Sequence, residues 1–218
     1  MKAKKIARQA LDFLPLPKPS LGRGKSVDAA LKARRTSRLV STRKLSRQLL
    51  SGLLWAACGV NRDTGPFGGV GRTAASASNA QEIDLYVLLE DGAWRYDPRA
   101  HGLRRVANGD LRGLAIGRGQ GGAGAQAPVR LVFVVDIGRF ATAGFDEPGL
   151  HDPETQKAYS HVGTGLIAQN VYLFAAAHGL ASWFHNCDSS ALAARLHLGS
   201  TQRALFGQTV GYPAGRRT

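Results

Sequence analysis

Residues 161–186, HVGTGLIAQNVYLFAAAHGLASWFHN, decide the fold class. Apolar and small residues fill most of the stretch before Gly179, which predicts the longest helix of the chain, buried over most of its circumference. Gly179 favours the left-handed conformation that ends many helices, and LASWFHN after it is predicted to be a strand. Helix and strand therefore follow one another within one short stretch.

Further strands flank this segment. The nearly continuous apolar run VRLVFVVDI at 129–137 predicts a buried strand, and ALFGQTVGYP near the end of the chain predicts another. Upstream, EDG joins IDLYVLL to AWRYDP, which predicts a hairpin. Helices and strands mixed in this way predict an α+β fold rather than a doubly wound sheet.

Capping residues locate three further helices. Each is expected to begin at a side chain that can accept a hydrogen bond from the first turn, namely Ser26, Ser46 and Asp188. The first of these helices should run through Arg35. In the second, LSRQLLSGLLWAAC has helical spacing of its leucines, and Gly59 is expected to end it in the left-handed conformation.

Three other segments complete the organisation of the chain. HGLRRVANGDLRGLAIG (101–117) is expected to form a short helix after a loop, and residues 138–160 a long loop or lid. Residues 1–25 form a basic arm interrupted by Pro15, Pro17 and Pro19. The predicted boundaries are therefore an arm over 1–25 and one domain over 26–218.

The chain of 218 residues is strongly basic, with a net charge of +14. Such a charge attracts nucleic acid, anionic membranes or anionic small molecules, but the arginines are spread along the chain rather than concentrated on one element. Cys58 and Cys187 are too few for a disulfide framework, and the histidines lack metal-site spacing. No stretch has the length of a signal-peptide core or membrane span, so we expect a soluble cytoplasmic protein without metal.

The segment KARRTSRLV (32–40) concentrates cations at a helix exit. Three guanidinium groups flank two hydroxyls, an arrangement suited to a phosphate because arginine forks and hydroxyls donate several hydrogen bonds at once. The alternative is a solvated basic helix end. GRGKS, just upstream, is not a P-loop, because Pro19 occupies the position of its first glycine.

Six motifs in order resemble the FMN-dependent nitroreductase family: RRTSR, LSRQLLSGLLWAACG, GRTAASASNAQ before a strand, AP before the strand at 129, AQNVYLFAAAHGL and VGYP. The resemblance covers about residues 26–213. It implies a central, mostly antiparallel or mixed sheet flanked by helices, and an intertwined homodimer with FMN at the interface. The segment 138–160 would then be a lid that tunes substrate choice.

The resemblance also implies site residues. The FMN phosphate would be held by Arg34, Arg35, Thr36 and Arg38. The loop lining the flavin ring and the partner's site would contain Ser76, Ala77 and Asn79, with Ala75 in place of the family's usual proline. Phe184, His185, Asn186 and Cys187 would pass over the ring, and Arg216 or Arg217 would reach it from the carboxyl terminus. No catalytic side chain is predicted, because the flavin carries the chemistry.

We therefore expect an FMN-dependent oxidoreductase that takes a hydride from NADH or NADPH onto flavin N5 and passes it to a nitroaromatic, quinone or similar acceptor in ping-pong fashion. One alternative is a related flavin dehydrogenase acting on azoline rings in modified peptides or on another specialised substrate. Another is a basic nucleic-acid-binding protein, which would be colourless and bind with steep salt dependence. The resemblance makes nucleic acid the less favoured partner.

Overall fold

A computed structural model of the protein describes residues 12–117 and 127–215. Within these residues a seven-stranded sheet has the order β1-β6-β5-β4-β7-β9-β8, and each neighbouring pair is antiparallel. Its strands are β1 (Phe13–Pro15), β4 (Ile83–Leu89), β5 (Gly92–Asp97), β6 (Gly102–Asn108), β7 (Val129–Asp136), β8 (Ala181–His185) and β9 (Gln202–Gly211). A separate ribbon pairs β2 (Val60–Arg62) with β3 (Gly71–Arg72).

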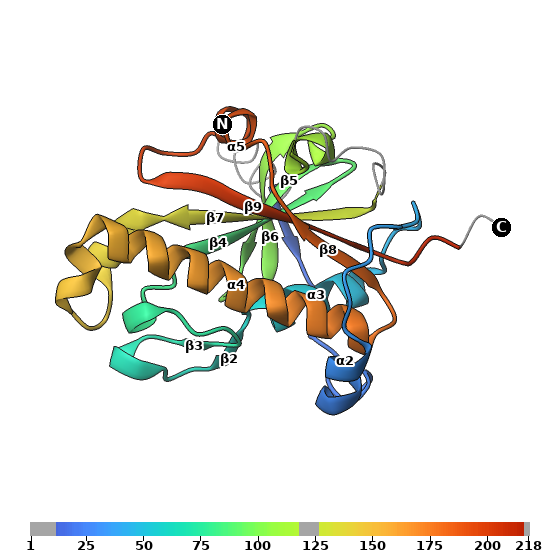
Figure 1. Ribbon diagram of the computed structural model, residues 1–218, viewed down its shortest axis with the longest axis horizontal. Helices are drawn as coiled ribbons and strands as arrows, with labels where there is room; N and C mark the ends of the chain where they lie inside the picture. Colours follow the sequence, from blue (N-terminus) through green and yellow to red (C-terminus); the bar gives the residue numbers. More distant parts are fainter. Residues whose placement is uncertain (1–11, 118–126, 216–218) are drawn as a thin grey trace, which may run out of the picture.

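Helices cover both faces of the sheet (Figure 1). The α-helices are α2 (Val27–Ala33), α3 (Arg47–Cys58), α4 (Pro153–Ala177) and α5 (Ser189–Arg195). The 3-10 helices are Pro66–Gly68, Ala77–Asn79, Arg112–Ala115, Ile137–Thr142 and Pro148–His151. Both α3 and α4 pack on one face, and α5 packs on the other. The predicted α+β class with a large antiparallel sheet is confirmed.

The central strands have apolar residues on both faces. On β4, Leu85 and Val87 join the core beneath α3 and α4, whereas Tyr86 and Leu88 join the core beneath α5. A strand whose successive side chains point to opposite faces must be apolar throughout when both faces are covered. This explains why IDLYVLL and VRLVFVVDI lack a polar alternation.

The prediction of a helix in 101–117 is wrong. Residues 102–108 form β6, which pairs with β5 on one edge and β1 on the other, and only Arg112–Ala115 is helical, as a 3-10 turn. Leu103 is buried in the core beneath α3 while Arg104 after it is exposed, which is the alternation of a strand. Pairing with β5 and β1 on its two edges has overridden the local preference.

Three other expectations need correction. The segment 138–160 holds two 3-10 helices and the start of α4, which begins at Pro153 after the N-cap Asp152. The helix α4 is not buried all round, since Val162 is 59% exposed and Leu166 43%. Gly59 does end α3, but with a φ of −70°. A glycine is needed there because a Cβ would lie 2.5 Å from Cδ1 of Trp55.

The described part of the amino-terminal arm packs on the domain. The strand β1 extends the sheet by pairing with β6. His101 contacts the segment that follows β1. Its Nε2 lies 2.7 Å from Oγ of Ser51 and 3.1 Å from the carbonyl of Pro17, and its Nδ1 lies 2.9 Å from the hydroxyl of Tyr96. Phe13–Pro15 therefore belong to the sheet, and the chain through Pro17 packs against the domain.

Candidate functional site

The arginine motif runs along the edge of the sheet. Ser26 caps α2, which ends where Arg34 takes the extended conformation (φ −59°, ψ 125°). The chain then passes beside β8, and the backbone N–H of Ser37 donates to the carbonyl of Ser182 at 2.8 Å. Because an extended chain turns successive side chains to opposite sides, the motif presents two different faces.

Tyr172 of α4 organises the first face. Its hydroxyl accepts a hydrogen bond from the backbone N–H of Phe184 at 2.8 Å and lies 3.1 Å from Oγ1 of Thr36. The guanidinium of Arg34 lies over the Tyr172 ring, 5.6 Å from its centroid. Arg38 lies 5.4 Å from the centroid of Trp183, which alternates with Phe184 on β8. The structure thus brings Arg34 and Thr36 together and sets Arg38 against a second ring nearby.

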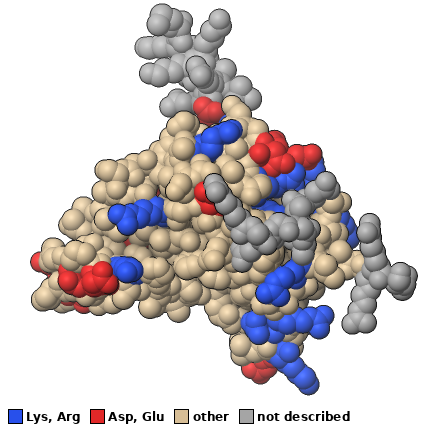
Figure 2. All heavy atoms as spheres, turned by 45° about the horizontal axis from the view of Figure 1, so that its top comes forward, with Lys and Arg blue, Asp and Glu red and all other residues tan. Residues whose placement is uncertain are grey.

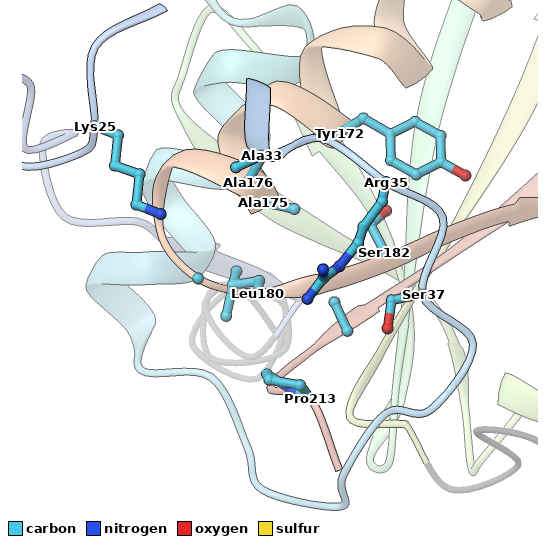
Figure 3. A pocket seen from close by; sticks show the side chains of 12 residues that line it. Lys25, Ala33, Arg35, Ser37, Tyr172, Ala175, Ala176, Leu180, Ser182 and Pro213 are labelled. Carbon is cyan, nitrogen blue, oxygen red and sulfur yellow. The ribbon is translucent and has the colours of Figure 1, made fainter. Parts of the chain in front are cut away.

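Arg35 and Ser37 line a cavity that Tyr172 also lines. This cavity, of about 150 Å³, lies between the end of α4, the start of β8 and Lys25. In Figure 3 the Arg35 side chain runs toward Leu180, whereas the Tyr172 ring points away from it. Thr36 therefore contacts the Tyr172 hydroxyl, whereas the Arg35 side chain runs along the Leu180 side of the same cavity.

The three motif arginines lack acidic partners. Within the described residues no carboxylate lies within 4.0 Å of Arg34, Arg35 or Arg38, although other arginines are paired: Arg104 with Asp97, Arg112 with Asp110 and Arg139 with Asp84. Lys and Arg side chains also gather around α2 at the lower right of Figure 2. Guanidinium groups without an acidic partner, beside hydroxyl groups, are suited to an anionic ligand.

The loop with Ser76, Ala77 and Asn79 lies near the other end of α4. Its backbone is strained, with positive φ at Ser78 (46°), Asn79 (54°) and Gln81 (54°). Oγ of Ser76 accepts from the N–H of Gln81 at 2.8 Å, and the Gln81 side chain donates to Oδ1 of Asn79 at 3.0 Å. These hydrogen bonds hold the strained backbone in place. Strained residues of this kind cluster at active sites and ligand-binding segments.

Within one chain the two predicted flavin-binding segments lie far apart. Ala77 shares a small apolar cluster with Tyr159, whereas the arginine motif contacts Tyr172. These tyrosines are about 20 Å apart along α4 at ~1.5 Å per residue. The fold therefore does not bring Arg34 and Asn79 together in a single protomer.

The segment after β8 is fixed by a buried network. Phe184 is half-buried against Phe206, with ring centroids 5.0 Å apart, and Asn186 is exposed. The carbonyl of Asn186 accepts from Nδ1 of His185 at 2.9 Å, so Nε2 of His185 must accept from Thr209, at 2.8 Å. Burial lowers the His185 pKa to about 4, so this imidazole is neutral.

Cys187 is not a reactive thiolate, because burial raises its pKa to about 11. Arg216, the remaining predicted contact, lies outside the described residues. No group of three or more His, Cys, Asp or Glu that could hold a metal occurs within 12–117 and 127–215. The same residues contain no helix long and apolar enough to cross a membrane.

The neutral His185 predicts a pH dependence of stability. Its pKa is lower in the folded protein, about 4, than the 6.5 of the free side chain, so the unfolded chain binds the proton more tightly. The free energy of unfolding should be unaffected by His185 above pH 6.5 and should fall by at most about 3 kcal/mol between pH 6.5 and 4.

Chemical denaturation across this range would check the prediction. The His185→Gln variant should lose part of the slope; His101 and His178, whose pKa values burial also lowers, account for a remainder. An equal slope in the variant and the wild type would contradict it.

Sequence reasoning missed Tyr172. The sequence indicates this residue only by a polar hydroxyl within an otherwise apolar stretch, VYLF, which is typical of a buried helix. Its position opposite Thr36 depends on how α4 packs beside the arginine motif, which the sequence does not state.

Comparisons with known proteins identify the family of this chain. The sequence profile of the nitroreductase family matches residues 31–212. The crystal structure of a putative nitroreductase from Ralstonia eutropha JMP134 is 32% identical with a TM-score of 0.82, covering 94% of this chain and 91% of that one. A putative nitroreductase of Methanocaldococcus jannaschii is 28% identical over 176 residues, 78% of this chain and 82% of its own length.

The fold also matches more distant oxidoreductases. The NADPH:FMN oxidoreductase of Vibrio harveyi, solved in complex with NAD+, superposes with a TM-score of 0.60 at 18% identity, over 87% of this chain and 69% of that one. Since the family profile spans most of the chain, the protein belongs to the nitroreductase family and is a flavin-dependent oxidoreductase.

Proposed function

We propose that this protein is an FMN-dependent NAD(P)H oxidoreductase that reduces nitroaromatic, quinone or similar acceptors in a ping-pong cycle. The observation that carries the proposal is that Arg34 and Thr36 lie against Tyr172 and Arg38 lies against Trp183 at the sheet edge, with no carboxylate within 4.0 Å of either arginine among the described residues. A phosphate monoester dianion needs several charge-assisted donors, and these side chains supply them.

The residues present fit FMN. Arg34, Thr36 and Arg38 would hold its phosphate, whereas Arg35 faces the neighbouring cavity and fits this role less well. Phe184 would offer an apolar wall to the ring, and Asn186 an exposed amide. FMN would supply the hydride transfer, from NADH or NADPH and then to the acceptor. Arg216 remains a predicted contact.

The site would be completed by a second copy of the chain. One protomer keeps Ala77 about 20 Å from the arginine motif along α4, so a coenzyme touching both segments would lie between two protomers. The exposed side of α4, with Val162 and Leu166, is an apolar surface available for such contact. We therefore propose a homodimer in which each site combines the motif of one copy with the loop of the other.

The direct test is a visible spectrum of the purified protein, with mass identification of the released cofactor and NAD(P)H-dependent reduction of nitroaromatic and quinone acceptors. A yellow protein that releases FMN and oxidises NADH or NADPH supports the proposal. A colourless protein with no FMN affinity, or one that binds nucleic acid with steep salt dependence, would overturn it. Activity only on azoline-containing peptides would replace the acceptor class while keeping the coenzyme.

Removing the Tyr172 hydroxyl should weaken FMN binding about tenfold. Tyr172→Phe leaves the N–H of Phe184 without its acceptor and Thr36 without its neighbour, and each lost hydrogen bond costs about 1 kcal/mol. Equilibrium titration with FMN, followed by flavin fluorescence, would measure the change. Tyr86→Phe, beneath α5 on the opposite face, is the control and should bind FMN as the wild type does.

A further inference from the structure

Glu82 is a buried acid without a partner. It lies directly after the loop 76–81 and before β4, it is 0% exposed, and neither carboxyl oxygen has a hydrogen-bond partner. Nε of Arg72 is also buried without a partner. The two side chains line one cavity of about 10 Å³, together with Ser76 and Gly163. Two unsatisfied buried groups on one cavity point to a polar occupant.

The helix above this cavity is adapted to the carboxyl group. Gly163 of α4 lies opposite Glu82, and a Cβ there would come within 2.5 Å of Oε1. Glycine inside a helix costs about 1 kcal/mol relative to alanine. Glycine at position 163 therefore makes the helix less stable but leaves space for the Glu82 carboxyl group.

The surroundings favour the protonated form of this acid. Burial raises the Glu82 pKa above its ordinary value, while the backbone N–H of Glu82 and the charges of Arg72 and Arg139 oppose this shift more weakly. Cys58 also lines the cavity, as a thiol whose pKa burial raises to about 11. By contrast, Asp84 has Nη2 of Arg139 at 2.7 Å and Nη1 of Arg95 at 3.8 Å.

We propose that Glu82 is a neutral carboxylic acid that, through one water shared with Arg72, supplies the proton consumed when the acceptor is reduced. A cavity of about 10–15 Å³ with polar partners holds one water, and water can accept from Arg72 while exchanging a proton with Glu82. Ser76 lines the cavity and is itself half-buried, so its hydroxyl can pass the proton outward. This inference rests on the proposed function.

The step balances in atoms and charge. The acceptor would gain a hydride, which the bound coenzyme would supply, and one proton, which would leave the O–H of Glu82 and reach the acceptor through the water and Ser76. The Glu82 carboxylate that remains is stabilised by the charges of Arg72 and Arg139. A solvent proton then restores the acid. No further oxidant or reductant is needed.

The test compares Glu82→Gln, which keeps the side-chain volume, with Glu90→Gln, which removes an exposed carboxylate paired with Lys44. Infrared spectroscopy at neutral pH should show a protonated-carboxyl band that shifts in D2O and is lost only in Glu82→Gln. In rapid mixing, Glu82→Gln should reduce the acceptor about 100-fold more slowly, the usual scale of general acid catalysis. Reduction of the flavin by NAD(P)H should stay unchanged in both variants.

The outcomes separate this inference from the proposed function. An absent band, a band that does not exchange in D2O, or an unchanged rate and pH profile of acceptor reduction in Glu82→Gln would overturn the role of Glu82 while FMN occupancy stays full. A protein without flavin would overturn the proposed function and the proton transfer together. The infrared band, recorded on flavin-free protein, would still decide whether the neutral acid exists.

Discussion

The double variant Arg34→Ala/Arg38→Ala should bind FMN roughly 10²–10⁴-fold more weakly than the wild type. Each guanidinium is expected to make a charge-assisted hydrogen bond to the phosphate, worth about 1.5–3 kcal/mol, and every ~1.4 kcal/mol is tenfold in affinity. Neither arginine has a carboxylate within 4.0 Å among the described residues, so their removal leaves no buried acid behind. Equilibrium titration and the flavin content of the purified variant would measure the loss.

Arg35→Ala is the control within the same motif, where it removes one positive charge against the two that the double variant removes. Its side chain faces the cavity with Lys25, so FMN affinity should fall by less than about threefold, through long-range charge alone. If Arg35→Ala weakens FMN binding as much as the double variant does, Arg35 contacts the phosphate as closely as Arg34 and Arg38 do. An unchanged FMN affinity in the double variant would show that the phosphate binds elsewhere.

A mixing experiment extends this test to the second copy. The arginine double variant would be co-expressed with a variant carrying Asn79→Gly and Ser76→Ala in the loop. If each site joins the motif of one copy to the loop of the other, a mixed dimer has one intact site, and about a quarter of all sites should recover FMN under random pairing. If motif and loop of the same chain formed the site, mixing would recover none.

The sequence predicted the fold well where local chemistry determines it. Ser26, Ser46 and Asp188 each cap the helix expected of them, and Gly179 follows the end of α4 with a φ of 67°. The β4–β5 hairpin also forms as expected. The strand β6 was missed because its conformation depends on pairing with β5 and β1, and no local pattern records those partners.

The candidate site, like the fold, could be predicted from the sequence only in part. The contiguous motif around Thr36 was recognisable because a phosphate needs its donors close together. That Arg35 lines a cavity with Lys25, and that Tyr172 joins Thr36 to Phe184, depends on contacts between segments distant in sequence. Glu82 and Gly163 likewise meet only because β4 packs beneath α4, so each residue alone looks ordinary.

Gly163→Ala should lower the free energy of unfolding of the flavin-free protein by about 2 kcal/mol. The added methyl group would lie 2.5 Å from Oε1 of Glu82, and overpacking of this kind costs about 1–3 kcal/mol. In the Glu82→Ala background the obstacle is gone, and the same substitution should instead stabilise by up to ~1 kcal/mol through helix propensity. Urea unfolding of the four proteins would therefore give a coupling energy of about 3 kcal/mol.

Gly165→Ala provides the control on the same helix, because a Cβ there meets nothing within 4 Å. Its effect, a gain of up to ~1 kcal/mol, should be equal with glutamate or alanine at position 82. A large coupling at Gly163 together with none at Gly165 would mean that α4 carries glycine specifically to admit the Glu82 carboxyl. Equal effects of Gly163→Ala in both backgrounds would mean that the acid moves aside at little cost, and a carboxyl group so loosely held would be poorly placed to deliver a proton through Ser76.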